Sequence, residues 1–241
     1  MFKSIMLGTA IVLDTFVCSV MTIIVSLFQK TGNIPHRVAR GWARSVLFIS
    51  RVRVDVEGLD NITAGESYVY MANHQSMYDI PALLGHLPVQ FRWLAKIELF
   101  RIPVFGYAMS RAGYIQIDRS NRRAAFKSIE RAARKVQEGA SIIIFPEGAR
   151  SKDGDIKAFK KGGFVLALKS KRPIVPVTVL GSQSILPKGS LKVRSGNILV
   201  RVHPPIATTG FTINTVEGLM EAVHSVICNS VKEYNIKKSS G

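Results

Sequence analysis

The chain has 241 residues, 47% of them hydrophobic, which argues against a disordered protein and suits one globular domain with an appendage. Its net charge of +17 favours polyanionic partners: anionic lipid surfaces, phosphorylated substrates or nucleic acid. No zinc-finger spacing, RNA-recognition signature or basic zipper region occurs, so nucleic acid is not an expected partner. Two isolated cysteines and scattered histidines give no metal-ligand spacing, so no metal site is expected.

The first segment, residues 5–28, is apolar apart from Asp14 and a few small hydroxyl side chains, and it is long enough to cross a bilayer core as a helix. Three interpretations of this segment are open: a signal peptide, a spanning helix and a half-inserted helix. The length and the lack of an Ala-x-Ala-like site argue against a signal peptide, and Asp14 is costly in hydrocarbon. Lys3 precedes the segment, whereas Lys30 and several arginines follow it. The positive-inside rule then predicts that the rest of the chain faces the cytoplasm.

Residues 35–51 are expected to form a helix with one cationic stripe and an apolar face opposite it. The stripe contains Arg37, Arg40, Arg44 and Arg51, and the apolar face contains Val38, Trp42, Val46 and Ile49. Such a helix suits the interface of an anionic membrane, and the alternative is a surface helix packed on its own domain. We favour the membrane interpretation, because a membrane-length segment directly precedes the helix. Residues 1–50 are therefore predicted to be membrane-associated helices.

From residue 51 onward, strand-like runs alternate with helical patterns. The runs cover residues 52–56, 68–71, 114–117, 141–145, 174–180 and 198–202. Helices are predicted over 120–139, with Ser120 as N-cap and Gly139 just past the end, and over 159–170 and 214–234. This alternation predicts that residues 51–241 form one three-layer α/β domain with helices on both faces of a sheet.

His74 follows the strand-like run at 68–71, and Asp79 comes five residues later. On one straight helix these side chains would point about 140° apart, so they can meet only if His74 lies in a loop and Asp79 in the first turn of the next helix. An aspartate on one ring nitrogen makes histidine a better general base. The alternative is that Ser76 and Asp79 form an ordinary capping box.

A second motif, residues 145–151, follows the run at 141–145. Gly148 allows a sharp turn, and Arg150 offers a planar fork that matches a phosphate. The alternative is a Pro-Gly turn with a solvated arginine.

A third motif ends at Asp118 and Arg119. No Gly-x-Ser-x-Gly elbow, Walker A loop or dinucleotide fingerprint occurs. An enzyme with this sequence would therefore need a base but has no obvious protein nucleophile. That combination suits direct attack by a substrate hydroxyl on an activated acyl group.

Together these motifs resemble the conserved blocks of the glycerolipid acyltransferases. Residues 73–79 resemble the His-x4-Asp block, 113–119 the second, 145–151 the Phe-Pro-Glu-Gly-Thr-Arg-Ser block with Ala149 in place of threonine, and 174–177 the fourth. The resemblance implies a three-layer domain with a mixed central sheet and a two-helix amino-terminal membrane motif. Within the family, the chain looks most like 1-acylglycerol-3-phosphate acyltransferases, which make phosphatidic acid from lysophosphatidic acid and an acyl thioester.

The resemblance also implies roles for single residues. His74 would be the base and Asp79 its orienting partner. Arg150, Glu147, Gly148 and Arg119 would hold the acceptor phosphate, and Lys96 would stabilise charge near the site. The donor would be acyl-ACP or acyl-CoA as co-substrate, without a cofactor. The alternatives are acylation of glycerol-3-phosphate or another lysophospholipid, and a non-enzymatic basic module that binds membranes or nucleic acid.

Overall fold

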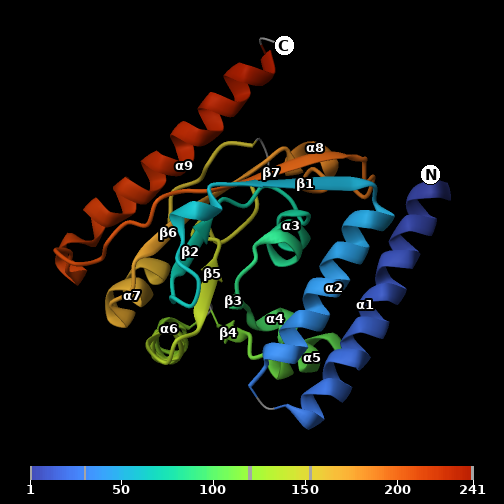
Figure 1. The fold of residues 1–241 in the computed structure, drawn as a ribbon, viewed down its shortest axis with the longest axis horizontal. Coiled ribbons are helices and arrows are strands. Elements are labelled where there is room, and N and C mark those ends of the chain that lie inside the picture. Colours follow the sequence, from blue (N-terminus) through green and yellow to red (C-terminus); the bar gives the residue numbers. More distant parts are fainter. Residues whose placement is uncertain (1, 30, 119–120, 152–153, 240–241) are drawn as a thin grey trace.

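The computed structural model describes residues 2–29, 31–118, 121–151 and 154–239 (Figure 1). Within these residues, seven strands form one sheet in the order β1-β7-β6-β2-β5-β3-β4. The strands are β1 (Val52–Glu57), β2 (Val69–Ala72), β3 (Phe91–Lys96), β4 (Ile115–Ile117), β5 (Ser141–Ile144), β6 (Ile174–Leu180) and β7 (Gly196–Val202). The sheet is mixed, because β7 is antiparallel to β6 and the other neighbours pair in parallel.

The central strands β2, β5 and β6 are buried along their whole length. Their sequences are nearly unbroken apolar runs, as expected for parallel strands covered on both faces. Pro176 lies inside β6 and has no backbone N–H to donate. The pairing of β6 with β7 begins one residue later, at Val177, so the proline is tolerated there.

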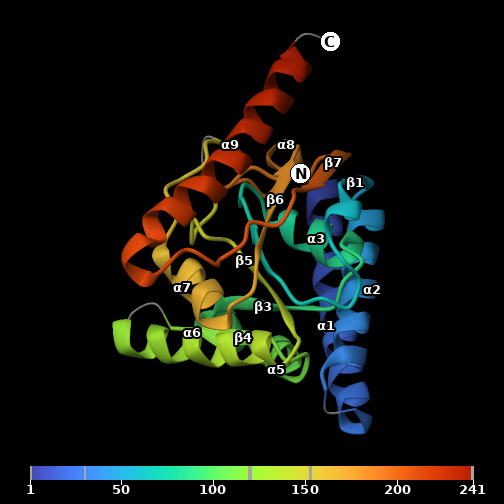
Figure 2. The ribbon, with the colours of Figure 1, turned by 60° about the vertical axis from the view of Figure 1, so that its left-hand side comes forward.

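Helices cover both faces of the sheet. On one face lie α2 (Asn33–Ile49) and α3 (Asp79–His86), and on the other lie α6 (Arg122–Gln137), α7 (Lys161–Ser170) and α9 (Val216–Ser239) (Figures 1 and 2). Short helices complete the chain: α4 (Ile97–Phe100), α5 (Phe105–Arg111) and α8 (Ser182–Ile185), with 3-10 turns at Leu59–Asn61 and Ile213–Thr215. The predicted three-layer α/β domain is confirmed.

Two details of the predicted elements were wrong. The N-cap of α6 is Asn121, whose side chain accepts hydrogen bonds from the backbone of Arg123 at 2.9 Å and of Ala124 at 3.2 Å. The predicted cap Ser120 lies outside the described residues. Strand β3 was not predicted, because Arg92 and Lys96 interrupt its apolar pattern. Arg92 is nevertheless buried, and it donates to the side chain of Asn33 at 2.6 Å.

The amino-terminal helix α1 (Phe2–Phe28) forms a hairpin with α2 and lies alongside it (Figure 1). Polar contacts join the two: Trp42 Nε1 donates to Thr15 Oγ1 at 2.9 Å, and Ser45 donates to Asp14. Part of the tryptophan face of α2 therefore contacts α1, and membrane contact of α2 stays a prediction. On that face Trp42 packs against the core cluster and Val46 is buried, whereas Ile49 stays exposed. Helix α2 also packs on the α/β domain through its buried side chains, as the alternative predicted.

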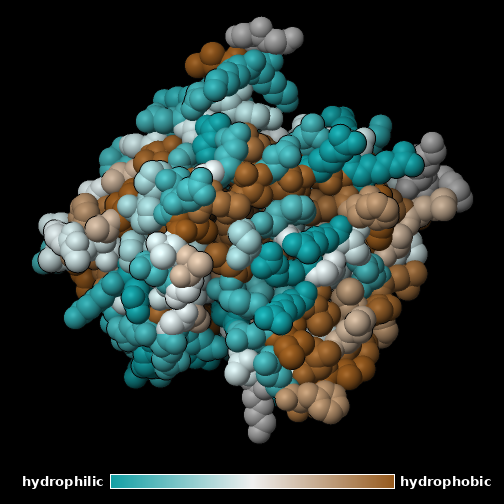
Figure 3. Space-filling view, viewed as in Figure 1, coloured by the Kyte–Doolittle hydropathy of each residue, from teal (hydrophilic) through white to brown (hydrophobic). Residues whose placement is uncertain are grey.

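Within the described residues, α1 is the one helix long and apolar enough to cross a membrane, over Ser4–Phe28. Large apolar side chains remain exposed along it, and Figure 3 shows them as a brown area. This outer face of α1 comprises Ile5, Val12, Leu13, Phe16, Val17, Met21, Ile24 and Leu27. A domain boundary at residue 50 stays a prediction, because α2 contributes buried side chains to the core of the α/β domain.

Candidate active site

The polar motifs gather at one edge of the sheet. Because β2, β5, β3 and β4 are parallel neighbours, their carboxyl ends meet there. His74 follows β2, Phe145 and Arg150 follow β5, and Lys96 ends β3. Active residues of open α/β sheets typically lie at such an edge.

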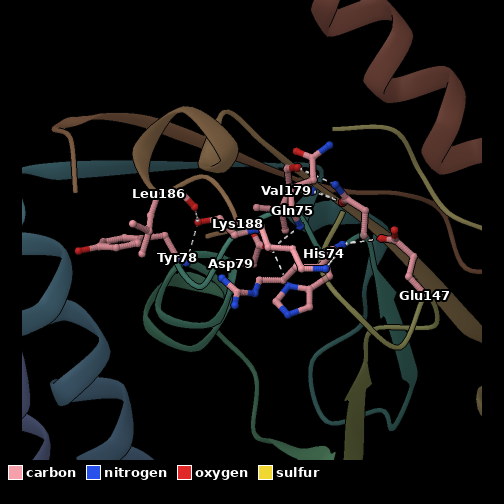
Figure 4. Close-up of polar contacts among 11 residues, drawn as sticks. His74, Gln75, Tyr78, Asp79, Glu147, Val179, Leu186 and Lys188 are labelled. Carbon is pink, nitrogen blue, oxygen red and sulfur yellow. Dashed lines mark hydrogen bonds and ion pairs between the residues drawn. The ribbon is translucent and has the colours of Figure 1, made fainter. Parts of the chain in front are cut away.

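His74 and Asp79 meet through the loop-to-helix geometry that their spacing required. His74 Nδ1 lies 2.8 Å from Asp79 Oδ2, and Asp79 is the first residue of α3 (Figure 4). The Asp79 carboxylate is fully buried, whereas the His74 side chain keeps 13% of its surface exposed. No described residue hydrogen-bonds to Nε2 of His74. The geometry thus fits an imidazole held at Nδ1 with Nε2 left for a ligand.

The alternative interpretation as a capping box is realised only in part. Asp79 Oδ2 accepts the backbone N–H of Ser76 at 2.9 Å, as a capping box would require, and also that of Gln75 at 2.8 Å. The Ser76 hydroxyl, however, donates to the Leu186 carbonyl at 2.9 Å. One carboxylate oxygen therefore serves the helix start and the histidine together.

Aromatic rings hold the plane of the His74 imidazole. Phe145 stacks on it with the ring centroids 4.0 Å apart and the planes 10° apart. Trp93 in turn stacks on Phe145, with centroids 5.5 Å apart. Hydrogen bonding at Nδ1 and stacking on one ring face together fix the direction in which Nε2 points.

Glu147 links two loops of the site, one with His74 and the other with Lys157. Its carboxylate accepts the backbone N–H of His74 at 2.7 Å and that of Lys157 at 3.0 Å. Burial raises the pKa of Glu147, and these two hydrogen bonds oppose the rise. Figure 4 shows Glu147 turned toward the backbone of His74. With both oxygens occupied, Glu147 holds the two loops together and does not present its carboxylate to a phosphate, which differs from the predicted contact.

A backbone hydrogen bond holds the loop of Arg150 beside the loop of His74. The N–H of Ser151 donates to the His74 carbonyl at 2.8 Å. The guanidinium of Arg150 is partly exposed and, among the described residues, has no hydrogen-bond partner. Its carbonyl accepts from Lys188 Nζ at 2.8 Å and from Lys157 Nζ at 3.5 Å. Arg150 thus combines an available planar donor with a surrounding positive field.

The remaining predicted site residues are the phosphate ligands Gly148 and Arg119 and the charge-stabilising Lys96. Gly148 has a φ of +76° and closes a tight turn, in which its own N–H donates to the Phe145 carbonyl. Lys96 is exposed at the end of β3, and Arg119 lies outside the described residues. Sequence reasoning missed Lys188, which arrives from the loop after α8. No local pattern marks it, because only the fold brings that loop beside Arg150.

Comparison with known proteins agrees with this geometry. A family model described as "Acyltransferase" matches residues 53–180. A 1-acyl-sn-glycerol-3-phosphate acyltransferase of Limnanthes douglasii is 35% identical over 198 residues, which cover 82% of this chain and 69% of the relative. The chain belongs to the acyltransferase family. The family resemblance predicted from the motifs is confirmed.

Further acyltransferases of the family extend the comparison. The chloroplastic 1-acyl-sn-glycerol-3-phosphate acyltransferase BAT2 of Brassica napus is 39% identical over 173 residues, or 71% of this chain. The chain matches 50% of that relative's length, so it spans about half of it. A crystal structure of the 1-acyl-sn-glycerophosphate (LPA) acyltransferase PlsC from Thermotoga maritima superposes with a TM-score of 0.81 at 26% identity, covering 97% of both chains.

Proposed function

We propose that this protein transfers an acyl chain from an acyl thioester to the sn-2 hydroxyl of lysophosphatidic acid, giving phosphatidic acid for phospholipid biosynthesis. The observation that carries the proposal is the His74–Asp79 pair, joined at 2.8 Å with Nε2 of His74 left for substrate. The relatives support this acceptor, because they are named as 1-acyl-sn-glycerol-3-phosphate acyltransferases.

In the proposed reaction, His74 Nε2 takes the proton of the acceptor hydroxyl while that oxygen attacks the thioester carbonyl. The new ester bond forms, the carbon–sulfur bond breaks, and the proton passes from His74 to the leaving thiolate. Asp79 supports the imidazolium that forms in between. Lys96 is proposed to stabilise the charge that develops near the site. The step proceeds without an acyl-enzyme and uses only the thioester co-substrate, either acyl-ACP or acyl-CoA.

Arg150 is proposed to hold the acceptor phosphate, together with Arg119 and with Gly148 shaping the turn. The guanidinium matches a phosphate in a bidentate manner, and Lys188 fixes the carbonyl of the same residue. Lysophosphatidic acid would then be bound by its phosphate on one side of His74. This arrangement favours phosphorylated acceptors over neutral ones.

The exposed outer face of α1 supports membrane association, with anionic lipids as the contacting surface. We propose that α1 lies against the bilayer and that the α/β domain faces the cytoplasm. The lysines and arginines that follow α1 in sequence support this orientation.

Replacing His74 by alanine tests the proposal. We expect transfer to lysophosphatidic acid to fall by about 10²–10⁴, the usual contribution of a general base. His224→Ala, on α9, serves as the matched control and should retain activity. Assays with lysophosphatidic acid, glycerol-3-phosphate, a neutral monoacylglycerol and a choline lysophospholipid should show a preference for the first. Substantial transfer by His74→Ala, or a preference for a neutral acceptor, would contradict the proposal.

A further inference from the structure

A stripe of cationic side chains runs along the exposed side of α6 and has no part in the proposed reaction. It comprises Arg123, Lys127, Arg131 and Arg134, and we call it the α6 stripe. Its members are spaced three or four residues apart, so they share one face of the helix. The opposite face, with Ile129, Ala133 and Val136, is buried in the core.

The α6 stripe has no ion-pair partner among the described residues. Glu130 instead pairs with Lys169 at 3.1 Å, and the hydrogen bond of Arg131 is to the Gln116 carbonyl at 3.4 Å. Glu138 lies one turn beyond the stripe. On α9, by contrast, acidic side chains at both ends pair with cations. Glu130 and Glu138 each lie four residues from Arg134, so the stripe keeps an excess of positive charge rather than a balanced one, and this excess attracts an acidic partner.

The position of α6 argues against a bilayer as that partner. The outer face of α1 is the large apolar surface, and α1 packs on α2, which covers one face of the sheet. Helix α6 covers the other face together with α7 and α9. Figure 1 shows α6 at the lower left of the molecule and α1 at its right. If α1 lies against the membrane, the α6 stripe faces the aqueous side.

The shape of the stripe argues for a protein rather than a small anion. From Arg123 to Arg134 the helix rises by about 16 Å, at 1.5 Å per residue. Its cations stand on a convex helix surface, whereas small ligands are usually gathered in concave sites. A spaced row of like charges suits a partner with a row of opposite charges.

We infer that the α6 stripe docks an acidic protein that carries the acyl chain as a thioester. The inference rests on the proposed function, since it names the donor for the same site. Helix α6 starts after the carboxyl end of β4, at the sheet edge that also holds His74, and runs back to the amino end of β5, so the Arg123 end of the stripe is the nearer one. A carrier bound along α6 therefore reaches the edge where the thioester must react with the end that contacts Arg123. Its association is steered by charge and weakens as salt rises.

The test uses the full chain in phospholipid vesicles with two donors, a palmitoyl-loaded acyl carrier protein and palmitoyl-CoA. The test variant is Lys127→Glu with Arg134→Glu. The matched control is Lys232→Glu with Lys238→Glu, which makes the same charge change at exposed positions of α9, a helix of the same layer. Transfer rates, vesicle binding and direct binding of unloaded carrier protein are measured for each.

For the test variant we expect KM for the carrier-protein donor to rise about tenfold or more at low salt, as charge reversal at an electrostatically steered contact should produce. Its kcat, its KM for palmitoyl-CoA and its vesicle binding should change less than about twofold, and the control should match the wild type. Equal losses with both donors, or no rise in KM for the carrier-protein donor, would overturn the inference. So would a selective loss of vesicle binding, which would make the stripe a lipid contact.

Direct binding separates this inference from the proposed reaction. If the wild type binds unloaded carrier protein and the test variant does not, the docking surface stands even where no transfer to lysophosphatidic acid occurs. If the wild type transfers from palmitoyl-CoA but does not bind the carrier protein, the reaction stands and the docking surface is rejected.

Discussion

At the scale of single residues, Asp79 shows how one carboxylate can fix a reactive side chain. Its Oδ2 accepts from His74, Gln75 and Ser76, whereas its buried Oδ1 has no partner among the described residues. Its place at the first residue of α3 puts the charge at the positive end of the helix. The loop and the imidazole are therefore held by one atom, which fixes the proposed base without any help from substrate.

Phe145 is expected to matter for the rate rather than for binding, because its ring sets the plane of the His74 imidazole. Phe145→Leu removes the flat face but keeps an apolar side chain. We expect kcat to fall about tenfold with little change in KM for the acceptor, since small misplacement of a catalytic group is costly. Phe145→Tyr should restore most of the rate.

Phe159→Leu, in the core on the other face of the sheet, is the control for a general loss of packing. The ring-proton NMR signals of His74 give a second measurement, because a ring stacked at 4.0 Å shields them. An unchanged His74 signal in Phe145→Leu, or a loss that Phe145→Tyr does not restore, would contradict the stacking role.

The sequence predicted His74 and Asp79 as a pair, because a five-residue spacing allows one geometry in which they meet. Phe145 was predicted only as part of a motif. Its stack on His74 depends on β2 and β5 being neighbours, and Trp93 joins it only because β3 lies beyond β5. Lys188 could not be predicted for the same reason: contacts between distant segments have no local pattern.

At the scale of elements, α2 joins the amino-terminal hairpin to the core. His36, near its start, is fully buried, and its Nδ1 lies 3.3 Å from the Tyr114 hydroxyl. Burial lowers the pKa of His36 to about 3, and the charges of Arg92 and Arg40 add to this effect. The histidine therefore stays neutral in the folded protein over most of the acid range.

This makes a prediction for the free energy of unfolding. Below about pH 6.5 the unfolded chain binds a proton at His36, whereas the folded protein does so only near pH 3. Stability should therefore fall as the pH is lowered through this window, by at most about 1.4 kcal/mol per pH unit from this group. Urea unfolding of His36→Gln between pH 6 and 4 should show a shallower slope than the wild type. An identical slope would show that other groups cause the acid sensitivity, and His224→Gln is the control.

The helices and strands were predicted to different degrees. Long apolar runs such as β6 and the amphipathic α6 follow directly from sequence. Strand β3 could not be recognised in the sequence, because Arg92 interrupts its apolar pattern. In the fold this buried guanidinium donates to the Asn33 side chain and to the Thr31 carbonyl before α2. The apolar face of α2 was visible, but its partner was not, because a stripe of this kind suits a bilayer and another helix equally well.

At the scale of the whole molecule, the layers follow one another from α1 through α2 and α3 to the sheet and then to α6, α7 and α9. The first layer exposes large apolar side chains, whereas α6 exposes mainly cations. This asymmetry gives the protein a side suited to lipid and a side suited to water.

Charges placed on the outer face of α1 should release the protein from membranes. For Val12→Glu with Phe16→Glu we expect at least a tenfold weaker partition onto anionic phospholipid vesicles, since burying each large apolar side chain contributes about 1.5–3 kcal/mol. Cosedimentation with vesicles measures this. The matched control is Ile213→Glu with Ile236→Glu, exposed in the opposite layer, and it should bind as the wild type does. Equal losses in both variants would argue against α1 as the contact.

The hairpin of α1 and α2 has a consequence for how such a protein can be handled. Ala43, Val46 and Leu47 of α2 belong to the same core cluster as Leu83 and Leu84 of α3, the helix that begins with Asp79. Removal of the first fifty residues would thus expose the hydrophobic core beside α3 and the loop that carries His74. We therefore expect that a chain cut at residue 50 would lose the packing that supports α3, so the amino-terminal hairpin cannot be treated as a detachable anchor.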